Sequence, residues 1–370
     1  MGGEIMRVLH VLTGLSNGGA ETYILNMYRN INREKIQFDF LLRSRNNNES
    51  LLNEISSLGG RVYYTSEFPK HILKNYKEMN SFFKCHPEYK IIHVHANSLV
   101  YITPLIVAKK YKIQCRIIHS HNTRTANDML YKPIHMFNKK IIKYIATTYL
   151  ACSEVAGKWM FNDSNFQIMK NAINVDKYSF NYEVREKIRN YYKLDGKLVL
   201  GNVGRFVYQK NHEFLIDIFN CVHARNKNAM LMLIGEGKLK SEIIEKVKYL
   251  GLSEKVMFIG AVSNVQDYLQ AMDIMVFPSH YEGLPITLIE AQAAGLKCFI
   301  SDNISDEICL TPLIKKIELK HNVEEWADEI LNESVDYSRN LMSYDLRDSG
   351  YDIKNEVVEL EKIYEQKYEG

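Results

Sequence analysis

The chain has 370 residues, a length that suits two domains better than one. Its composition, with 46% hydrophobic, 25% charged and 11% aromatic residues, excludes collagen-like, low-complexity and wholly disordered chains. The net charge of +3 is unevenly divided, because residues 1–172 carry +11 (23 Lys and Arg, 12 Asp and Glu) and residues 173–370 carry −8 (24 and 32). A basic first half predicts an anionic partner, such as a phosphate-bearing substrate, a phospholipid surface or nucleic acid.

Six cysteines are spread along the chain without a close pair, which argues against a disulfide framework or a cysteine zinc site. The segment Arg7–Leu12 runs into a glycine-rich turn without a signal-peptide cleavage site, and no run of about 18 apolar residues is present. We therefore expect a cytoplasmic protein without a signal peptide or a membrane-spanning helix.

Short apolar runs alternate with longer helical patterns in both halves, which is typical of βαβ units and parallel sheets. The strands predicted in the first half are Val8–Thr13, Phe38–Leu42, Arg61–Tyr64, Ile91–His95, Arg116–His121 and Tyr149–Cys152. Those predicted in the second half are Leu198–Val203, Met230–Ile234, Val256–Ile259, Ile274–Phe277 and Cys298–Ser301. The pattern predicts an α/β protein whose eleven strands form two doubly wound parallel sheets.

The polar segment Lys170–Asp176 is interpreted as a linker, which divides the chain into domains at 1–172 and 173–350. Residues 351–370 are predicted to form a helix that packs back on the first domain, with an apolar stripe at positions 353, 357, 360 and 364. Ligands of doubly wound sheets bind outside the carboxyl ends of the strands. A cleft that the two domains face is therefore the expected site.

The first motif, Thr13–Glu21, follows the first predicted strand and opens a helix. Gly18 and Gly19 would let the backbone approach an anion, which the amides and dipole of a helix amino terminus favour. A tight turn that needs glycine for steric reasons explains the same residues equally well. The motif is not G-x-G-x-x-G, which counts against a dinucleotide enzyme.

Two features of the first half concern histidine and lysine. His93 with His95 and His119 with His121 are alternate residues that share a strand face, so each pair can bind a metal ion or line a pocket, and the second reading is simpler. Basic and apolar residues interleave over 109–145. This segment is interpreted as a surface for anionic lipid, although lysine stems packed over the domain are the plain alternative.

In the second half, Arg205 and Lys210 lie on the loop after the strand Leu198–Val203, close behind Gly204. A guanidinium and an ammonium at a strand end can converge on a diphosphate, whereas the plain alternative is two solvated surface cations.

The segment Phe277–Ala291 carries two carboxylates of different kinds. Glu282 is predicted on a loop just before a helix start at Pro285, and Glu290 lies inside that helix. The apolar surroundings of Glu290 would bury it, and a buried carboxylate needs partners, such as the two hydroxyls of a ribose.

Four motifs together resemble the retaining glycosyltransferases of family 4, which have the GT-B fold of two Rossmann-like domains. They are Gly18-Gly19-Ala20-Glu21, Gly204-Arg205 with Lys210-Asn211, Gly235-Glu236-Gly237, and Glu282-Gly283-Leu284-Pro285 with Glu290. The resemblance covers roughly residues 7–300 and is strongest to bacterial enzymes that assemble exopolysaccharide and capsule. The linker departs from the family's Pro-Asn-Gly-Val-Asp segment, since it lacks that proline and glycine.

The resemblance implies a role for each matching residue. Arg205 and Lys210 neutralise the donor diphosphate, Glu290 holds the ribose and Glu282 contacts the donor sugar, while His121 lies beside the transferred sugar. The remaining donor-binding positions are Gly18, Gly19, Gly204, Gly235, Glu236, Gly283, Leu284 and Pro285.

The implied function is retaining transfer of a sugar from a nucleoside-diphosphate sugar to a lipid-linked or saccharide acceptor in exopolysaccharide, capsule or O-antigen synthesis. UDP-sugars are preferred to GDP-sugars as donors, and a peripheral place at the inner face of the cell membrane is expected. The sequence contains no Asp-x-Asp, so we expect no metal and no cofactor. The alternatives are a nucleotide-sugar epimerase and a binding homologue without activity. Nucleic acid is not an expected partner, because no signature of such binding is found.

Overall fold

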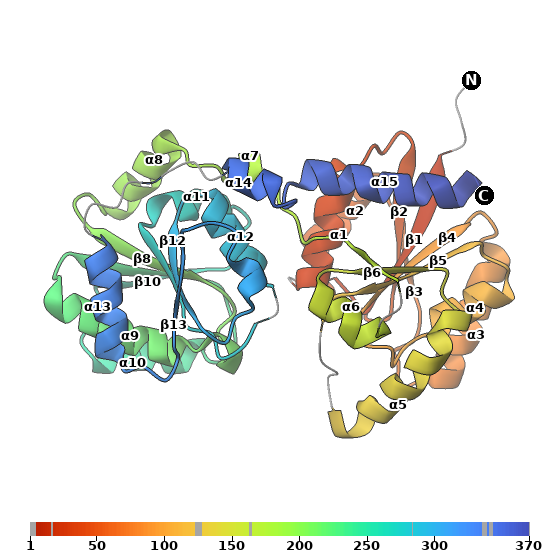
Figure 1. Cartoon of the computed structure of the whole chain (residues 1–370), viewed down its shortest axis with the longest axis horizontal. Helices are drawn as coiled ribbons and strands as arrows, with labels where there is room; N and C mark the ends of the chain where they lie inside the picture. The colour runs from red at the N-terminus through yellow and green to blue at the C-terminus, as the bar shows by residue number, and fades with distance from the viewer. Residues whose placement is uncertain are drawn as a thin grey trace. The chain divides into compact units, whose positions relative to one another are not determined.

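The computed structural model describes residues 5–15, 18–122, 128–162, 165–282, 284–334, 339 and 343–369. The chain divides into two compact units, of which unit 1 contains residues 1–172 and 353–370 and unit 2 contains residues 173–352 (Figure 1). Among the described helices, none combines the length and the hydrophobicity that a bilayer crossing requires.

Unit 1 is built around a parallel sheet that, in the described residues, has the strand order β3-β2-β1-β4-β5-β6-β7. Its strands are β1 (Met6–Leu12), β2 (Ile36–Leu42), β3 (Val62–Tyr64), β4 (Ile91–Ala96), β5 (Cys115–Ser120), β6 (Thr148–Ala151) and β7 (Gln167–Ile168). Its helices are α1 (Gly19–Asn30), α2 (Glu49–Ser57), α3 (Ile72–Cys85), α4 (Thr103–Lys110), α5 (Asp128–Ile141), η1 (Ile142–Tyr144), α6 (Glu154–Phe161) and α15 (Ile353–Glu369). The strand order reverses between β1 and β4.

The strands are apolar along most of their length because helices cover both faces of the sheet (Figure 1). On β1, Val8 and Leu12 belong to one core cluster, whereas Leu9 and Val11 belong to the cluster on the opposite face. The run of apolar residues that the sequence shows is therefore the alternation of two buried faces.

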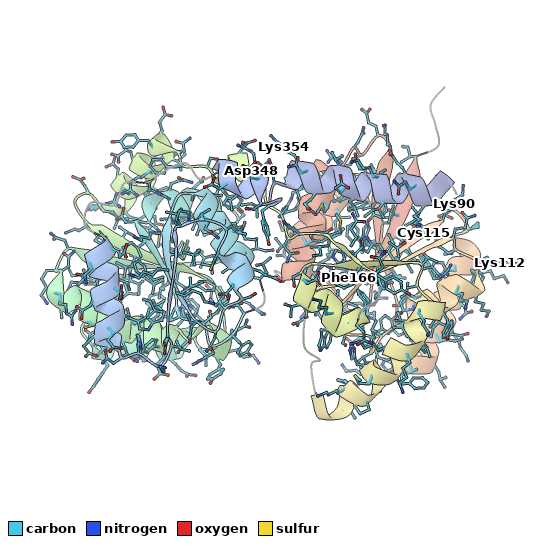
Figure 2. All side chains as sticks on the ribbon, in the orientation of Figure 1. Lys90, Lys112, Cys115, Phe166, Asp348 and Lys354 are labelled. Carbon is cyan, nitrogen blue, oxygen red and sulfur yellow. The ribbon has the colours of Figure 1, made fainter. Side chains whose placement is uncertain are left out.

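Helix α15 returns from the end of the chain to unit 1, where it contacts α1 and β4. Its residues Leu360 and Tyr364 are fully buried in the same core cluster as Val8. Near its carboxyl end, the Lys90 ammonium lies 4.4 Å from the centre of the Tyr368 ring, and Figure 2 shows Lys90 at that end of the helix.

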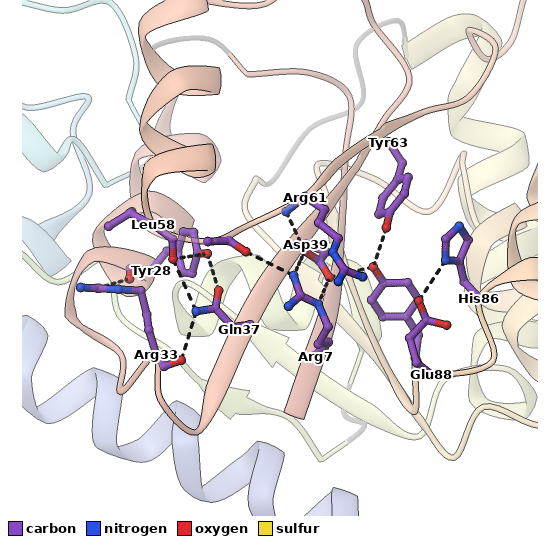
Figure 3. A network of polar contacts seen from close by, with 12 residues as sticks. Arg7, Tyr28, Arg33, Gln37, Asp39, Leu58, Arg61, Tyr63, His86 and Glu88 are labelled. Atoms are coloured by element: carbon purple, nitrogen blue, oxygen red, sulfur yellow. Dashed lines mark hydrogen bonds and ion pairs between the residues drawn. The ribbon is translucent and has the colours of Figure 1, made fainter. Parts of the chain in front are cut away.

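An ion pair joins Arg7, near the amino end of β1, to Asp39 in the middle of β2 (Figure 3). Arg7 donates from Nε and Nη2 to the two carboxylate oxygens of Asp39 at 2.6 and 2.5 Å, and Asp39 is fully buried. The Tyr89 hydroxyl and the Arg61 amide donate to the same carboxylate at 2.7 Å each. This network satisfies a buried charge away from the strand carboxyl ends, so we assign it to the stability of unit 1.

Unit 2 contains a second parallel sheet, with the order β10-β9-β8-β11-β12-β13 in its described residues. Its strands are β8 (Leu198–Val203), β9 (Ala229–Ile234), β10 (Val256–Gly260), β11 (Ile274–Phe277), β12 (Lys297–Ser301) and β13 (Ile314–Ile317). Its helices are α7 (Val175–Tyr178), α8 (Tyr182–Tyr192), η2 (Tyr208–Lys210), α9 (His212–Arg225), α10 (Lys240–Tyr249), α11 (Val265–Ala271), α12 (Ile286–Ala293), η3 (Asp306–Ile308), α13 (Val323–Ser334) and α14 (Ser343–Asp348).

The predicted pair of parallel, doubly wound sheets is confirmed, but the prediction of eleven strands is wrong because it omits β7 and β13. Strand β7 has only two residues, and both are exposed. Strand β13 reads Ile-Lys-Lys-Ile and lies at the sheet edge. Neither carries the apolar run by which buried parallel strands are identified.

Candidate functional site

The order of the unit 2 sheet reverses at β8, which has β9 on one side and β11 on the other. Ligands of doubly wound sheets bind beyond the strand ends at such a switch point. Three segments follow these strands there, namely residues 204–211 after β8, 235–239 after β9 and 278–285 after β11. Most of the residues that the sequence singles out in the second half lie in these segments.

The loops after β8 and β9 are joined through their backbones. The Gly204 amide donates to Ile234 O at 2.9 Å, and the Phe206 amide donates to Glu236 O at 3.1 Å. Gly235 has a φ of +142°, and a Cβ atom there would lie 2.1 Å from Gly204 O. Glycine at 235 is therefore required by the approach of the two loops.

Lys210 and Glu282 form an ion pair that links the loop after β8 to the loop after β11. Lys210 Nζ lies 2.7 Å from Glu282 Oε1, and the exposed fractions of the two side chains are 15% and 7%. The ammonium also lies 4.4 Å from the centre of the Phe277 ring. Burial lowers the pKa of Lys210, while the Glu282 charge opposes this change and the nearby charge of Arg205 adds to it.

Gln209 holds the second carboxylate oxygen of Glu282. Its Nε2 donates to Glu282 Oε2 at 3.0 Å and to the backbone oxygen of Tyr281 at 3.1 Å. Its backbone carbonyl accepts from the His280 amide at 2.9 Å. The Tyr208 and His280 rings stack across the same two loops, with centroids 4.3 Å apart. Glu282 thus lies on a loop, as predicted, but its side chain is buried and held from two sides.

The three other charged residues of these loops, Arg205, Glu236 and Lys238, face solvent. Arg205 is exposed, with its side chain on the loop that carries Lys210. Glu236 is also exposed and pairs with Lys240 at 2.6 Å, one helical turn further along the chain. A guanidinium in this position can reach an anion without breaking a buried contact, whereas Lys210 would exchange its partner.

Glu290 lies on α12, which begins after Pro285 as the sequence predicts. Burial raises the pKa of Glu290, while a hydrogen bond from Tyr178 and the charge of Lys177 oppose the rise. Leu284 is half-buried before the helix, and Gly283 lies outside the described residues. The geometry therefore presents a carboxylate on a rigid helix beside a tyrosine hydroxyl.

Gly18, Gly19 and His121 belong to unit 1, where they follow β1 and β5. Gly18 is the N-cap of α1, and a Cβ atom there would lie 2.4 Å from Glu21 Oε2. At Gly19 no heavy atom of the described residues lies within 4 Å of such a Cβ. His121 Nε2 lies 2.9 Å from Nδ1 of His95, so the predicted histidine is part of a larger group.

A hollow of about 500 Å³ in unit 2 lies away from these loops. Phe180, Arg185 and Asp273 line it together with Leu198, the first residue of β8. It therefore opens near the amino ends of β8 and β11, where a doubly wound sheet does not bind its ligand.

Sequence reasoning missed Gln209, Tyr178 and His10 as residues that contact candidate site residues. Gln209 stands between Arg205 and Lys210 in the sequence, so its place in the motif was a usable signal. Tyr178 is more than 100 residues from Glu290, and no local pattern links them. His10 interrupts the apolar run Val8–Leu12 of β1, but only the fold shows that this histidine is buried beside other histidines.

Comparisons with known proteins identify the family and the fold of this chain. Residues 184–309 match the family model described as glycosyl transferases group 1. EpsF of Bacillus subtilis, named as a glycosyltransferase, is 32% identical over 97% of this chain and 96% of its own length. The UDP-Gal:alpha-D-GlcNAc-diphosphoundecaprenol alpha-1,3-galactosyltransferase of Escherichia coli is 24% identical over 79% of this chain and 80% of its own length.

Among solved structures, that of HepE from Anabaena in complex with UDP has a TM-score of 0.77, with 15% identity over 98% of this chain and 100% of that one. This likeness confirms the expected GT-B fold class. The epimerase alternative finds no support in these relatives. With a relative above 30% identity along nearly its whole length, the chain belongs to the glycosyl transferases group 1 family.

Proposed function

We propose that this glycosyltransferase moves a sugar from a UDP-sugar to a lipid-linked saccharide in the synthesis of a bacterial surface polysaccharide, with retention of the anomeric configuration. The observation that carries the proposal is the buried Lys210–Glu282 pair at the switch point of unit 2, with Arg205 on the same loop. The family of this chain supports the reaction class. The names of the Escherichia coli relative and of the UDP-bound HepE structure support a UDP-sugar as the donor.

Donor binding is proposed to exchange the partner of Lys210. The Lys210 ammonium is paired with Glu282 in the structure, so a diphosphate that reaches it together with Arg205 would release that carboxylate for the hydroxyls of the donor sugar. Glu290 is proposed to accept from the ribose hydroxyls, which would add to the hydrogen bond that its carboxylate accepts from Tyr178. In unit 1, Gly18 and Gly19 are proposed to bind phosphate, and His121 is proposed to contact the transferred sugar.

Cleavage of the bond between the anomeric carbon and the diphosphate leaves negative charge on the leaving group. Lys210 and Arg205 stabilise that charge as it develops, which is electrostatic catalysis without a covalent bond to the protein. In the retaining course, the acceptor hydroxyl attacks from the face that the diphosphate leaves, and a phosphate oxygen takes its proton. Because two cations serve the leaving group, we propose that transfer requires no metal ion at the diphosphate.

Helix α5 carries the proposed contact with a membrane surface. Its inner face is fixed by His135, which accepts from the Leu99 amide at 3.1 Å, and by Asn138, which donates to Leu99 O at 2.6 Å. Its outer face exposes Leu130, Ile134 and Phe137, at the spacing of one helical stripe. Exposed Lys132, Lys140 and Lys143 lie on α5 and the following turn. An exposed apolar stripe flanked by lysines is typical of helices that lie in the interface of an anionic bilayer.

The reaction is tested by screening UDP- and GDP-sugars for a thermal shift of the full chain, followed by incubation of the best donor with and without a polyprenyl-diphosphate saccharide. We expect a UDP-sugar, a product only in the presence of acceptor, and an α-linked product from an α-linked donor by NMR. Isomerisation of the donor without acceptor would instead identify an epimerase. An inverted linkage would contradict retention.

The membrane contact is tested by sedimentation with vesicles that contain or lack anionic phospholipid. We expect the wild-type chain to sediment with anionic vesicles and Phe137→Ser combined with Lys140→Glu to lose most of this binding. Tyr249→Ser, which removes an exposed aromatic residue from unit 2, serves as the matched control and should bind as the wild type does. Equal sedimentation of all three proteins would contradict the assignment of α5.

A further inference from the structure

Five histidines gather on one face of the unit 1 sheet. His10 lies on β1, His93 and His95 lie on β4, and His119 and His121 lie on or directly after β5. The strand register pairs His10 with His93 and His95 with His119. Because paired and alternate residues of parallel strands share a face, this register brings all five imidazoles together, on the face that α1 and α15 cover.

One chain of contacts runs through three of the rings. Nδ1 of His10 lies 3.0 Å from Nε2 of His95, and Nδ1 of His95 lies 2.9 Å from Nε2 of His121. Three neutral imidazoles carry three N–H groups, of which these two hydrogen bonds use two. One end of the chain therefore always keeps an unused N–H and the other end an unused lone pair.

A second chain links two rings to α15. Nε2 of His93 lies 3.2 Å from Nδ1 of His119, and Nδ1 of His93 lies 2.7 Å from the Tyr364 hydroxyl. His93, His119 and Tyr364 are fully buried. The contact with His93 occupies Nδ1 of His119 and leaves Nε2 of that ring for another partner.

Several polar atoms of the cluster are buried without a hydrogen bond to any described residue. They are His10 Nε2, His119 Nε2, His121 Nδ1 and the hydroxyl of Tyr23. The Tyr23 ring packs against the rings of His119 and His121, with centroids 5.0 and 5.5 Å apart. Buried polar groups in folded proteins have partners, so this concentration of unsatisfied nitrogen atoms requires an explanation.

Metal ions bind the neutral form of imidazole, through the lone pair of a ring nitrogen.

We propose that His95, His119 and His121 bind one divalent transition-metal ion, with Zn²⁺ as the expected metal. One ring nitrogen from each of the three lies within 4.8 Å of the others, so small side-chain rotations can bring them to the spacing of a three-histidine site. His10, His93 and His95 satisfy the same distance criterion, but His10 and His93 are fully buried. His95 and His121 are partly exposed, which gives a metal ion a path to the group of His95, His119 and His121.

Other residues of the cluster contact His95, His119 and His121 from the side away from the proposed ion. Nε2 of His93 would accept from the Nδ1–H of His119, and the Nδ1–H of His93 would donate to the Tyr364 oxygen. His10 would orient His95. Such partners set the tautomer and the orientation of metal-binding histidines. Imidazole nitrogen favours zinc, copper, nickel and iron over magnesium and calcium, so this ion differs from an oxygen-bound cation at the diphosphate, which the sequence gives no reason to expect.

The proposal is tested by metal content, independently of transferase activity. The full chain is stripped with a chelator, dialysed against Zn²⁺ or Co²⁺ and measured by elemental mass spectrometry and by the visible spectrum of the Co²⁺ form. We expect one bound ion per chain and the absorption bands of a site with nitrogen ligands. His119→Phe should weaken the affinity for the ion at least about a hundredfold. His93→Phe, which removes the hydrogen-bond partner of His119 Nδ1, should weaken it about tenfold or more.

His71→Ala, which removes an exposed histidine of unit 1, is the matched control and should keep the full metal content. Where a histidine variant does not fold, a crystal of the wild-type chain grown with Zn²⁺ and measured at the zinc absorption edge gives the answer directly. A peak bonded to ring nitrogens of His95, His119 and His121 supports the proposal. Wild-type protein that binds no ion, a peak elsewhere, or unchanged binding by His119→Phe would overturn it and leave a metal-free, hydrogen-bonded histidine cluster.

Discussion

The two units place different chemistry at the same point of the same topology. In unit 1 the strand order reverses between β1 and β4, and five histidines gather there, of which His10, His93 and His119 are fully buried. In unit 2 it reverses between β8 and β11, and the loops beyond those strands carry Lys210 paired with Glu282. The sheet therefore supplies a location, and the residues at the strand ends decide which ligand chemistry that location can support.

The comparison also shows that the proposed anion site does not follow the net charge of the sequence. Unit 2 is formed by the acidic half of the sequence, yet it holds Lys210 and Arg205, whereas the basic half exposes its lysines on and beside α5. What distinguishes Lys210 is its position, because a largely buried ammonium with one carboxylate partner is poised to exchange that partner for another anion.

The largest expected effect is on the charges of unit 2. Arg205→Ala, Lys210→Ala and Glu290→Ala should each lower turnover at least about a hundredfold, the usual result of losing a preorganised electrostatic contact of about 2.7 to 4 kcal/mol. Turnover is measured with the donor that gives the largest thermal shift in the screen proposed above. Lys246→Ala, which breaks a surface pair with Asp217, is the control and should stay close to wild type. Near-normal turnover in all three site variants would refute the assignment.

Lys210 allows folding and chemistry to be separated. Lys210→Met leaves Glu282 buried without its charge partner and should lower the melting temperature, whereas Lys210→Met combined with Glu282→Gln should recover stability but not activity. Recovery of both would show that the pair serves the fold alone.

The next effect concerns the backbone of the unit 2 loops. Gly235→Ala should destabilise unit 2 by roughly 2 to 4 kcal/mol, because the new methyl group would meet Gly204 O in a backbone conformation that L residues rarely adopt. Gly251 has a φ of +69°, and no described heavy atom lies within 4 Å of a Cβ atom added there. Gly251→Ala should therefore lower the free energy of unfolding by only about 1 kcal/mol. Denaturant unfolding measures both, and equal losses would show that loop contact is unimportant.

The smallest effect is a pH dependence in unit 1. Burial raises the pKa of Glu356 from 4.5 to about 7, although its carboxylate accepts from the Lys170 amide. The folded state therefore binds the proton more tightly, and the stability from this group is lost as the pH rises from about 4.5 through 7.

Glu356→Gln should remove this loss, so that the variant gains about 2 to 3 kcal/mol over wild type between pH 4.5 and 8. Unfolding of both proteins at the two pH values gives the difference, in which the titration of the buried histidines cancels. Glu34→Gln, at an exposed carboxylate of unit 1, is the control. A gain of the same size there would contradict the role of burial.

Local patterns predicted most of the secondary structure and the position of Glu290 on a helix after Pro285, because apolar runs and the turn residues that bound them act over short distances. The edge strand β13 was not predicted, because its lysines interrupt the apolar pattern. Tyr178 beside Glu290 and Tyr364 beside His93 could not be predicted, since contacts between residues distant in sequence leave no local signal.

The sequence by itself determined the two parallel sheets, the membership in a glycosyltransferase family and the residues at which a donor is proposed to bind. Only the tertiary structure decided that Lys210 is paired with Glu282, that Gly235 is required by Gly204, and that five histidines from three strands form one cluster. The physical reason is that residue type and local periodicity are properties of a short segment. Strand register, burial and the partner of a charge arise only when distant segments pack together.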